Sequence, residues 1–306
     1  MMYPLKFKPI YKEKIWGGDH LKRIFGREIP SCQIGESWDL SSHHHGMSIV
    51  ANGDLAGLSL DELMTKYKDE LMGSQHKNMK IFPLLIKIID ANDNLSIQVH
   101  PEDQDAYRGG EFGKTEAWYV VYAKENAQII YGLQDDITKE DFVRAIKNNA
   151  IAKTLKKVHV KVGDMIFVPA GTIHALLDGV MVYEVQQNSD TTYRIYDYDR
   201  LDAVGKGREL QIEKALNTIH FGRQPSCVFP DEKIKCQYFS MEKLVVSGEK
   251  EEKTNNAFMI YCIITGSGAI QYKQAMEPLY PGDTILIPAS LEKVIVKGEL
   301  TLLKIT

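Results

Sequence analysis

Segments with a two-residue hydrophobic period make up most of the chain, whereas segments with a helical period are few and short. Residues 5–16, 35–50, 83–91, 95–100, 113–123, 165–168, 174–177 and 181–200 have the alternating or continuously apolar pattern of β-strands, and the chain is strand-like again beyond residue 233. Helical periodicity predicts helices at residues 59–73, 138–149 and 210–219. The first two begin with capping boxes, Ser59 with Glu62 and Thr138 with Asp141. The pattern predicts a mainly β protein with a few short helices.

One stretch, residues 162–178, combines sharp turns with two apolar strands. A turn at Gly163 precedes the first strand, and Pro169 with Gly171 bends the chain before the second. Side chains alternate along a strand, so His174 points a single imidazole into the mouth of a barrel. The spacing G-x5-P-x-G-x2-H-x3-D resembles the second signature of the cupin barrel, with Asp178 in place of the usual Asn. We therefore predict that His174 is a metal ligand and not simply a core histidine.

A second set of candidate ligands lies in residues 95–100, where apolar residues alternate with Ser96, Gln98 and His100. A period of two places these polar side chains on one face of a strand. Such a face is normally solvated, but Pro101 ends the strand and so places His100 at the rim of a barrel. Gln98 and His100 occupy the positions of the H-x-H pair of the first cupin signature. Both are candidate metal ligands, and the neutral amide is the weaker one.

Charged residues also enter strands that are otherwise aromatic. Glu116 follows His100 by 16 positions, and a carboxylate is costly to bury in such a strand unless it binds something. It is either a metal ligand or the partner of Lys114 in a buried ion pair. Glu184 and Asp190 belong either to the site or to a structural cluster of ion pairs.

Two further features concern Arg194 and the segments near the beginning of the sequence. Arg194 is flanked by Tyr193 and Tyr196, and its fork of donors suits a phosphate group. Trp16 precedes two glycines, which let the backbone pass close to a strand or a ligand, and a packed Trp beside a turn is the simpler interpretation. Residues 43–45 are three consecutive histidines. Adjacent strand residues face opposite sides, so we expect a solvated loop there and no shared metal.

An internal repeat divides the chain into two parts. The sequence PGDTILIPASLEKVIV at residues 281–296 matches VGDMIFVPAGTIHALL at residues 162–177, with the turn Gly and Pro at an offset of 119 positions. In the second copy Lys293 replaces His174. We expect two cupin-type (jelly-roll) β-barrels: a catalytic domain at residues 1–222 with helical insertions, and a smaller domain at residues 233–306 that lacks metal ligands. Residues 223–232 are the predicted linker.

Composition narrows the class of protein without identifying it. The 306 residues are 44% hydrophobic and 25% charged, with a formal net charge of −4, which gives no electrostatic footprint for nucleic acid. The four cysteines are scattered without C-x-x-C spacing, so disulfides and thiolate metal sites are not expected. The first residues contain no apolar signal region, and no run of 18 apolar residues occurs. We expect a cytoplasmic protein without membrane association.

Several motifs in order carry a resemblance to a known family. They are the segment at Trp16, IQVHP at residues 97–101, GKTEAW at residues 113–118, PAGTIHAL at residues 169–176 and EVQQNSDTTYRIYDYDR at residues 184–200. Together they resemble the short bacterial form of type I phosphomannose isomerase. The family's members are two-cupin, zinc-dependent cytoplasmic enzymes, which interconvert mannose 6-phosphate and fructose 6-phosphate.

The resemblance implies a role for each candidate residue. One Zn²⁺ per chain would be bound by His100, Glu116 and His174, with Gln98 as the fourth ligand. Arg194 would be the active-site arginine, Lys114 a pocket lysine, and Trp16 a substrate contact. Proton transfer between the two carbons would proceed through an enediol(ate) intermediate. The base would be Glu184, Lys114 or a metal-bound water.

The residues alone leave two other functions open. Ligands of the His and Glu type also suit Fe(II), which would make the protein a non-haem iron cupin dioxygenase. A third possibility is a sugar-phosphate-binding cupin without catalysis. Phosphate-binding cations in the same pocket favour the isomerase over the dioxygenase. The sequence leaves the oligomeric state open.

Overall fold

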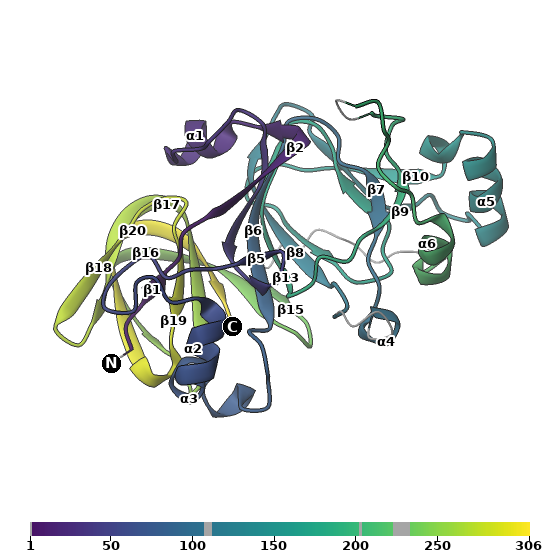
Figure 1. Cartoon of the computed structure of the whole chain (residues 1–306). Helices are drawn as coiled ribbons and strands as arrows, with labels where there is room; N and C mark the ends of the chain where they lie inside the picture. Colours follow the sequence, from purple (N-terminus) through teal and green to yellow (C-terminus); the bar gives the residue numbers. More distant parts are fainter. Residues whose placement is uncertain (1, 107–111, 202–203, 223–232) are drawn as a thin grey trace.

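The computed structural model describes residues 2–106, 112–201, 204–222 and 233–306. β-Strands are the main regular structure of the described chain, and they are arranged as two barrel-like bodies side by side (Figure 1). The predicted fold class, mainly β with two cupin-type barrels and a few short helices, is confirmed. The predicted linker, residues 223–232, lies outside the described residues. No helix in the described part of the chain has the length and apolar character needed to cross a bilayer.

Two antiparallel sheets form the first barrel. The five-stranded sheet has the order β10 (Leu155–His159), β9 (Gln128–Leu133), β12 (His174–Leu176), β7 (Ile97–Val99), β14 (Tyr193–Tyr196). The six-stranded sheet has the order β11 (Met165–Val168), β8 (Glu116–Ala123), β13 (Val180–Gln187), β6 (Leu84–Ala91), β3 (Ile34–Leu40), β2 (Ile10–Gly18). Apolar residues of both sheets meet in one buried cluster, which includes Leu176, Ile129, Trp118 and Val182.

The interior of this barrel changes from apolar to polar along its strands. On β13, Val180 and Val182 belong to the apolar cluster, whereas Glu184 is the next residue on the same face. On β12, Leu176 belongs to the cluster and His174 is the preceding residue on that face. The apolar end supplies the packing that holds the two sheets together, and the other end is left for polar side chains.

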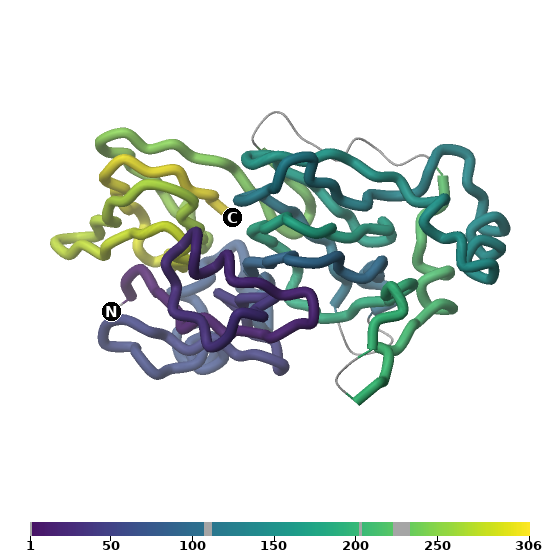
Figure 2. Tube along the Cα trace, turned by 90° about the horizontal axis from the view of Figure 1, so that it is seen from above, coloured from purple at the N-terminus to yellow at the C-terminus, as the bar shows by residue number. Residues whose placement is uncertain are grey.

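A seven-stranded sheet forms the second body. Its order is β1 (Leu5–Lys6), β19 (Thr284–Ile287), β17 (Met259–Tyr272), β20 (Lys293–Ile305), β16 (Ser240–Lys253), β15 (Lys233–Lys235), with β18 (Ala275–Leu279) paired to β17. Leu5 is the register partner of Leu286, so the first strand of the chain belongs to the sheet formed by the last residues. In Figure 2 the N-terminus lies beside the yellow C-terminal body. The division into domains at residues 1–222 and 233–306 stays a prediction.

The internal repeat has the same local structure in both copies. β11 and β19 start and end at positions related by the offset of 119, and β12 and β20 both begin at the repeated position, His174 and Lys293. Gly163 has a φ of 95° and Gly282 a φ of 87°, a conformation that favours glycine in both turns. In the second copy Lys293 pairs with Glu251 on the surface, at 2.9 Å from Nζ to Oε2. The repeat keeps the turn and lacks the imidazole.

Six α-helices and three short 3-10 helices are described. They are α1 (His20–Phe25), α2 (Leu60–Lys66), α3 (Lys68–Met72), α4 (Asp103–Ala106), α5 (Lys139–Lys147), α6 (Ile212–Thr218), η1 (Ser74–His76), η3 (Ile151–Lys153) and η4 (Ala289–Leu291). Both capping boxes are present. The prediction of one helix at residues 59–73 is wrong, because Tyr67 leaves helical geometry (φ −136°, ψ 26°) and divides it into α2 and α3. Apolar residues of α5 and α6 pack against the outer face of the five-stranded sheet.

Candidate metal centre and active site

The register of the five-stranded sheet aligns three of the predicted site residues. Gln98 on β7 lies opposite His174 on β12 and, on its other side, opposite Arg194 on β14. Side chains directly across a ladder point to the same face, so these three residues form one row inside the barrel. His100 follows Gln98 by two residues and shares its face.

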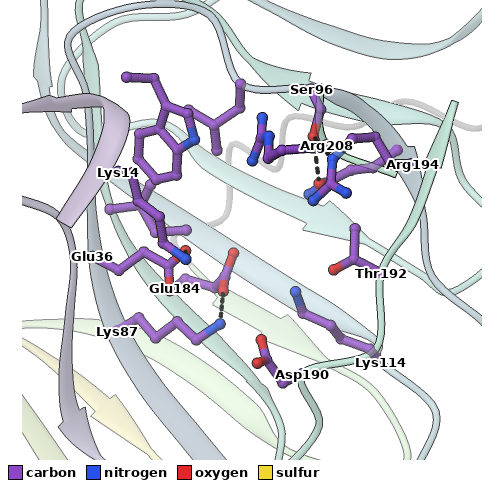
Figure 3. Close-up of a pocket in the computed structure, with 14 residues that line it drawn as sticks. Lys14, Glu36, Lys87, Ser96, Lys114, Glu184, Asp190, Thr192, Arg194 and Arg208 are labelled. Carbon is purple, nitrogen blue, oxygen red and sulfur yellow. Dashed lines mark hydrogen bonds and ion pairs between the residues drawn. The ribbon is translucent and has the colours of Figure 1, made fainter. Parts of the chain in front are cut away.

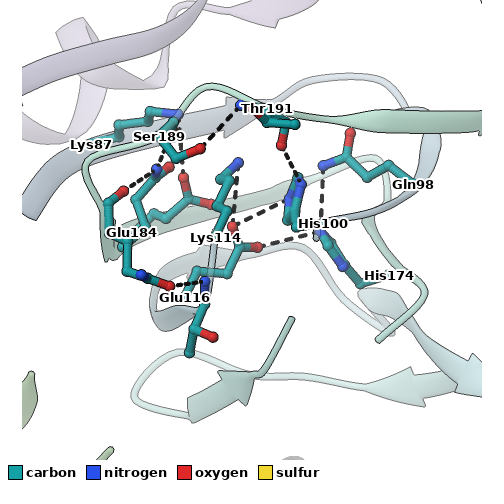
Figure 4. A network of polar contacts seen from close by, with 12 residues as sticks. Lys87, Gln98, His100, Lys114, Glu116, His174, Glu184, Ser189 and Thr191 are labelled. Atoms are coloured by element: carbon teal, nitrogen blue, oxygen red, sulfur yellow. Dashed lines mark hydrogen bonds and ion pairs between the residues drawn. The ribbon is translucent and has the colours of Figure 1, made fainter. Parts of the chain in front are cut away.

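The six-stranded sheet contributes a second row that faces the first. Glu184 on β13 is the register partner of Lys87 on β6 and of Trp118 on β8. Glu116 lies two residues before Trp118 on the same face, and Lys114 precedes it by two more. The site is therefore formed where two closely packed sheets bring imidazoles from one side to carboxylates and amines from the other (Figure 4).

Hydrogen bonds fix the orientation of both buried imidazoles. Nδ1 of His100 lies 2.9 Å from the carbonyl oxygen of Thr191, and Nδ1 of His174 lies 2.9 Å from that of Thr172. A carbonyl oxygen can only accept, so each Nδ1 carries the proton and donates it. In the neutral ring the lone pair then lies on Nε2. Carbonyl groups that hold Nδ1–H in this way are typical of histidine metal ligands.

The two Nε2 atoms point at one carboxylate. Nε2 of His174 is 3.3 Å from Oε1 of Glu116, and Nε2 of His100 is 3.5 Å from Oε2. Neither oxygen of Glu116 nor Nε2 of His100 has a hydrogen-bond partner among the described residues. The amide nitrogen of Gln98 lies 3.4 Å from Nε2 of His174, so this side chain reaches the same point. Nζ of Lys114 lies 3.4 Å from Oε2 of Glu116, so the buried ion pair that the sequence left open as an alternative is also present. The two imidazoles and the carboxylate nevertheless converge on one point, and this arrangement fits a metal ion.

Burial determines the protonation of this group. Burial lowers the pKa of His174 to about 4, and it lowers the pKa of His100 well below its usual value, with a further contribution from Lys114. Both imidazoles are therefore neutral at pH 7. Burial raises the pKa of Glu116 although Lys114 and Lys87 act against it. A bound cation would hold this carboxyl group in its ionised form.

A pocket of about 270 Å³ opens next to these residues, and its walls are mostly polar. Its lining includes Lys87, Lys114, Glu184 and Asp190 at one end, Ser96, Arg194 and Arg208 at the other, and Lys14 and Glu36 along the side (Figure 3). Trp16 also lines the pocket. Of the predicted metal ligands, Gln98 also lines it. The pocket therefore joins the candidate metal centre to a group of cations.

Glu184 and two lysines form the buried end of the pocket. Oε2 of Glu184 accepts a hydrogen bond from Nε1 of Trp118 at 2.9 Å, and Oε1 lies 3.6 Å from Nζ of Lys87. Burial raises the pKa of Glu184, and the carboxylate of Glu116 raises it further. Burial alone lowers the pKa of Lys114, but the carboxylates of Glu116 and Glu184 outweigh burial and raise it. A carboxyl group with a raised pKa thus lies between ammonium groups that remain charged.

Two guanidinium groups mark the other end. Nε of Arg194 donates to Oγ of Ser96 at 3.2 Å, and its Nη1 donates to the carbonyl oxygen of Glu209 at 3.0 Å. Nε of Arg208 donates to Oδ2 of Asp197 at 2.7 Å. Arg200 also donates to Asp197, so this carboxylate holds the guanidinium groups of Arg200 and Arg208 in position. The arginines have fixed directions, which suits recognition of an anion.

The remaining predicted residues differ in their surroundings. Trp16 is buried and lines the pocket, while Gly17 lies so close to Gln33 and Gly35 that a Cβ would clash with their backbone. The glycine therefore permits close strand packing, and the substrate contact of Trp16 stays a prediction. Asp190 lines the pocket and accepts from the His45 ring. Burial raises its pKa, but Lys87 and His45 outweigh burial and lower it.

The prediction that strand alternation keeps the three histidines at residues 43–45 apart is wrong. They lie in a hairpin whose turn reverses the chain between β4 (Ser42–His43) and β5 (Gly46–Met47), so strand alternation does not apply. Their possible ligand atoms lie within 4.8 Å of one another. His43 is also buried, whereas His44 and His45 are exposed as a solvated loop requires.

Sequence reasoning missed several residues of the pocket, among them Lys87, Glu36 and Arg208. Lys87 interrupts the apolar run of residues 84–89, and a charge in such a run is a signal that could have drawn attention to it. Glu36 lies beside Lys14 and receives a hydrogen bond from Trp38, which its sequence position does not indicate. Arg208 lies in a polar, irregular segment without periodicity, and no pattern distinguishes it from other surface arginines.

Family models match both parts of the chain. The model described as phosphomannose isomerase type I, catalytic domain, matches residues 4–129, and the model described as mannose-6-phosphate isomerase, cupin domain, matches residues 232–306. These matches agree with a metal centre in the first barrel, because the family comprises metalloenzymes.

Curated relatives and solved structures match over the full length. The mannose-6-phosphate isomerase ManA of Bacillus subtilis is 40% identical over 96% of both chains, and the mannose-6-phosphate isomerase of Streptococcus mutans is 37% identical over 99% of this chain and 98% of its own. A crystal structure of the mannose 6-phosphate isomerase from Bacillus subtilis matches with a TM-score of 0.91 at 39% identity, and each chain is covered completely. The chain therefore belongs to the type I phosphomannose isomerase family, whose members are aldose–ketose isomerases that act on mannose 6-phosphate.

Proposed function

We propose that the protein is a zinc-dependent isomerase that interconverts mannose 6-phosphate and fructose 6-phosphate, with its metal held by His100, Glu116, His174 and Gln98. The observation that carries this proposal is the convergence of two Nε2 lone pairs on the Glu116 carboxylate at 3.3 and 3.5 Å. Two imidazoles and a carboxylate are a donor set that zinc accepts, and the amide of Gln98, whose nitrogen faces His174, would have to turn its oxygen toward the ion. Bound there, the ion would supply Lewis acidity at the oxygens of the substrate.

The two ends of the pocket support one orientation of the substrate. Arg194 and Arg208 would bind the phosphate, since their donors are held by Ser96, Glu209 and Asp197. The reacting carbonyl and hydroxyl carbons of the sugar would then lie toward Glu184, Lys87 and Lys114. Binding energy from the phosphate, which does not react, would fix the reacting carbons in place. The buried ring of Trp16 forms a side wall that excludes water.

Proton transfer between neighbouring carbons needs one group that accepts and returns a proton. Among Glu184, Lys114 and a metal-bound water, the surroundings favour Glu184. Its Oε1 is buried without a hydrogen-bond partner among the described residues, and its raised pKa brings the carboxyl group closer to neutral pH. Lys114 and Lys87 would remain protonated and stabilise negative charge on the oxygens of the enediol(ate).

The proposal also covers the two domains of the protein and its location in the cell. Residues 1–222 would form the catalytic cupin domain, and residues 233–306 a cupin-like domain without ligands, as Lys293 at the repeated position indicates. A sugar phosphate substrate and scattered cysteines, of which Cys32, Cys236 and Cys262 are free, support a cytoplasmic location.

The test is the metal content and the activity of a His174→Ala variant. We expect loss of bound zinc and of mannose 6-phosphate isomerisation together. His159→Ala, which removes an exposed imidazole on β10, is the matched control and should keep both. Full metal occupancy in His174→Ala would overturn the ligand assignment. Iron in place of zinc in the wild-type protein would overturn the choice of metal.

A further inference from the structure

The three histidines at residues 43–45 form a compact cluster outside the candidate metal centre. His43 ends β4, and His44 with His45 forms the turn that leads into β5. The ring centroids of His43 and His44 are 4.2 Å apart, and those of His44 and His45 are 4.1 Å apart. One ligand atom from each residue lies within 4.8 Å of the others. This cluster is called the histidine hairpin below.

The spacing of the histidine hairpin is close to what a single ion requires. With Zn–N bonds of about 2.0–2.1 Å, two nitrogens on one tetrahedral ion lie about 3.4 Å apart. The rings of His44 and His45 therefore have to move by little more than an ångström. Both residues are exposed, so rotation about their side-chain bonds can provide this movement.

A carboxylate already orients one of the rings. Nδ1 of His45 lies 2.9 Å from Oδ2 of Asp190. An ionised carboxylate only accepts, so Nδ1 of His45 carries the proton and Nε2 is left with its lone pair. A carboxylate that holds the far nitrogen of an imidazole is the usual support of a histidine ligand, because it fixes the ring and raises its basicity.

Two contacts weaken the site relative to the candidate metal centre. Nδ1 of His43 accepts the backbone N–H of His45 at 3.1 Å, so an ion bound through this nitrogen has to replace that hydrogen bond. Nζ of Lys12 donates to the carbonyl oxygen of His45 at 2.7 Å, which places a positive charge nearby. Exposure of two ligands and these contacts give the histidine hairpin a lower affinity than a buried centre with a carboxylate ligand.

We propose that the histidine hairpin is an accessory binding site for a divalent transition-metal ion that imidazole prefers, such as Zn²⁺ or Ni²⁺. His44 and His45 supply the first two ligands, His43 the third, and Asp190 the supporting carboxylate. The site shares no ligand with His100, Glu116 and His174. It is nevertheless linked to the pocket, because Asp190 lines that pocket.

The experiment is equilibrium dialysis of the holoenzyme against micromolar Zn²⁺, with zinc per chain as the readout. The wild-type protein should bind one more Zn²⁺ per chain than the double variant His44→Gln/His45→Gln. Both proteins should keep the ion of the candidate metal centre. His159→Gln, which removes an exposed imidazole elsewhere, should bind as the wild type does.

A second variant separates a built site from adventitious binding by surface imidazoles. Asp190→Asn should weaken uptake of the additional ion by about 10–100-fold, the usual effect of removing a carboxylate that supports a ligand. Equal zinc uptake by the wild-type protein and the double variant would overturn the proposal. Unchanged affinity in Asp190→Asn would show that the carboxylate does not support the site as proposed.

Discussion

Oε1 of Glu116 and Nε2 of His174 lie 3.3 Å apart, although Glu116 belongs to the six-stranded sheet and His174 to the five-stranded sheet. The contact therefore bridges the two walls of the barrel. Both atoms present lone pairs, because Nδ1 of His174 donates its proton to Thr172. Nζ of Lys114 lies 3.4 Å from the other oxygen of this carboxylate, and a bound ion would add ligand bonds from both walls.

Removing the metal is accordingly expected to destabilise the protein. An ion that binds only the folded state adds RT ln(1 + [L]/Kd), which is about 4 kcal/mol at a thousandfold excess over Kd. Tm should fall when a strong chelator is added to the wild-type protein, as measured by calorimetry. His174→Ala is the control, and its Tm should respond little to the chelator. An unchanged Tm in wild-type protein shown to have lost its metal would contradict the bridging role.

Replacement of Glu184 by Gln removes the proposed proton carrier and leaves its shape. We expect kcat to fall by about 10²–10⁴-fold, the usual contribution of a general acid–base group. Bound metal should stay unchanged. Release of deuterium from C2 of labelled mannose 6-phosphate into water measures the transfer directly. The exposed Glu213→Gln should behave as wild type, and rapid deuterium release by Glu184→Gln would assign the transfer to another group.

Lys87→Met should lower activity and shift its pH dependence. Lys87 lies 3.6 Å from Glu184 and lowers the pKa of that carboxyl group, so its removal raises this pKa. The rise of activity with pH, which requires ionised Glu184, should then move to higher pH. We expect kcat to fall by about 10²-fold, as for loss of one charge-stabilising donor. The exposed Lys156→Met is the control. A reduced kcat without the shift would indicate that Lys87 acts independently of Glu184.

Arg208→Ala should reduce discrimination in favour of the phosphorylated sugar. A hydrogen bond to a charged group contributes about 1.5–3 kcal/mol, so kcat/KM for mannose 6-phosphate should fall by about 10–100-fold. Any activity on free mannose should not fall with it. Arg144→Ala, on the exposed face of α5, is the matched control. An equal loss on both sugars would place Arg208 in a structural role through Asp197.

The lowered pKa of Glu36 predicts that the folded protein loses stability in acid. Burial alone raises its pKa, but Lys87 and Lys14 outweigh burial and lower the pKa from its usual 4.5 to about 2. A lowered folded-state pKa stabilises the protein above the unfolded value, and this stabilisation is lost as pH falls from about 4.5 to about 2. The difference corresponds to about 3 kcal/mol. Urea unfolding should show Glu36→Gln less stable than wild type at pH 6, with a gap that closes near pH 2. A gap independent of pH would exclude titration of Glu36 as its cause.

Local spacing was sufficient to predict the residues that meet at the candidate centre. His100 ends a strand before Pro101, and His174 follows a Pro–Gly corner, so turn chemistry and strand alternation define where each imidazole points. Glu116 was identified by the energetic penalty of burying a carboxylate among aromatic residues. The roles of these residues stay predictions, because only their positions are given by the fold.

Contacts that depend on chain reversal or on distant pairing were not predictable in this way. The alternation rule fails for His43 and His45, because a two-residue turn separates the strands that carry the hairpin. The charge of Lys87 in an apolar run is visible in the sequence, but its partner Glu184 is known only from the pairing of β6 with β13. Tyr67 interrupts a helix whose apolar period continues, and the sequence pattern gives no sign of this break.

The pairing of Leu5 with Leu286 has a consequence for how the molecule is made. On the ribosome, the first strand emerges long before the segment that receives it, so it stays without its partner through nearly all of translation. The C-terminal sheet is then completed by the oldest part of the nascent chain, which gives this sheet a slow, long-range closing step. An extension fused ahead of β1 therefore has to move with this strand to the edge of the sheet when β1 pairs with β19.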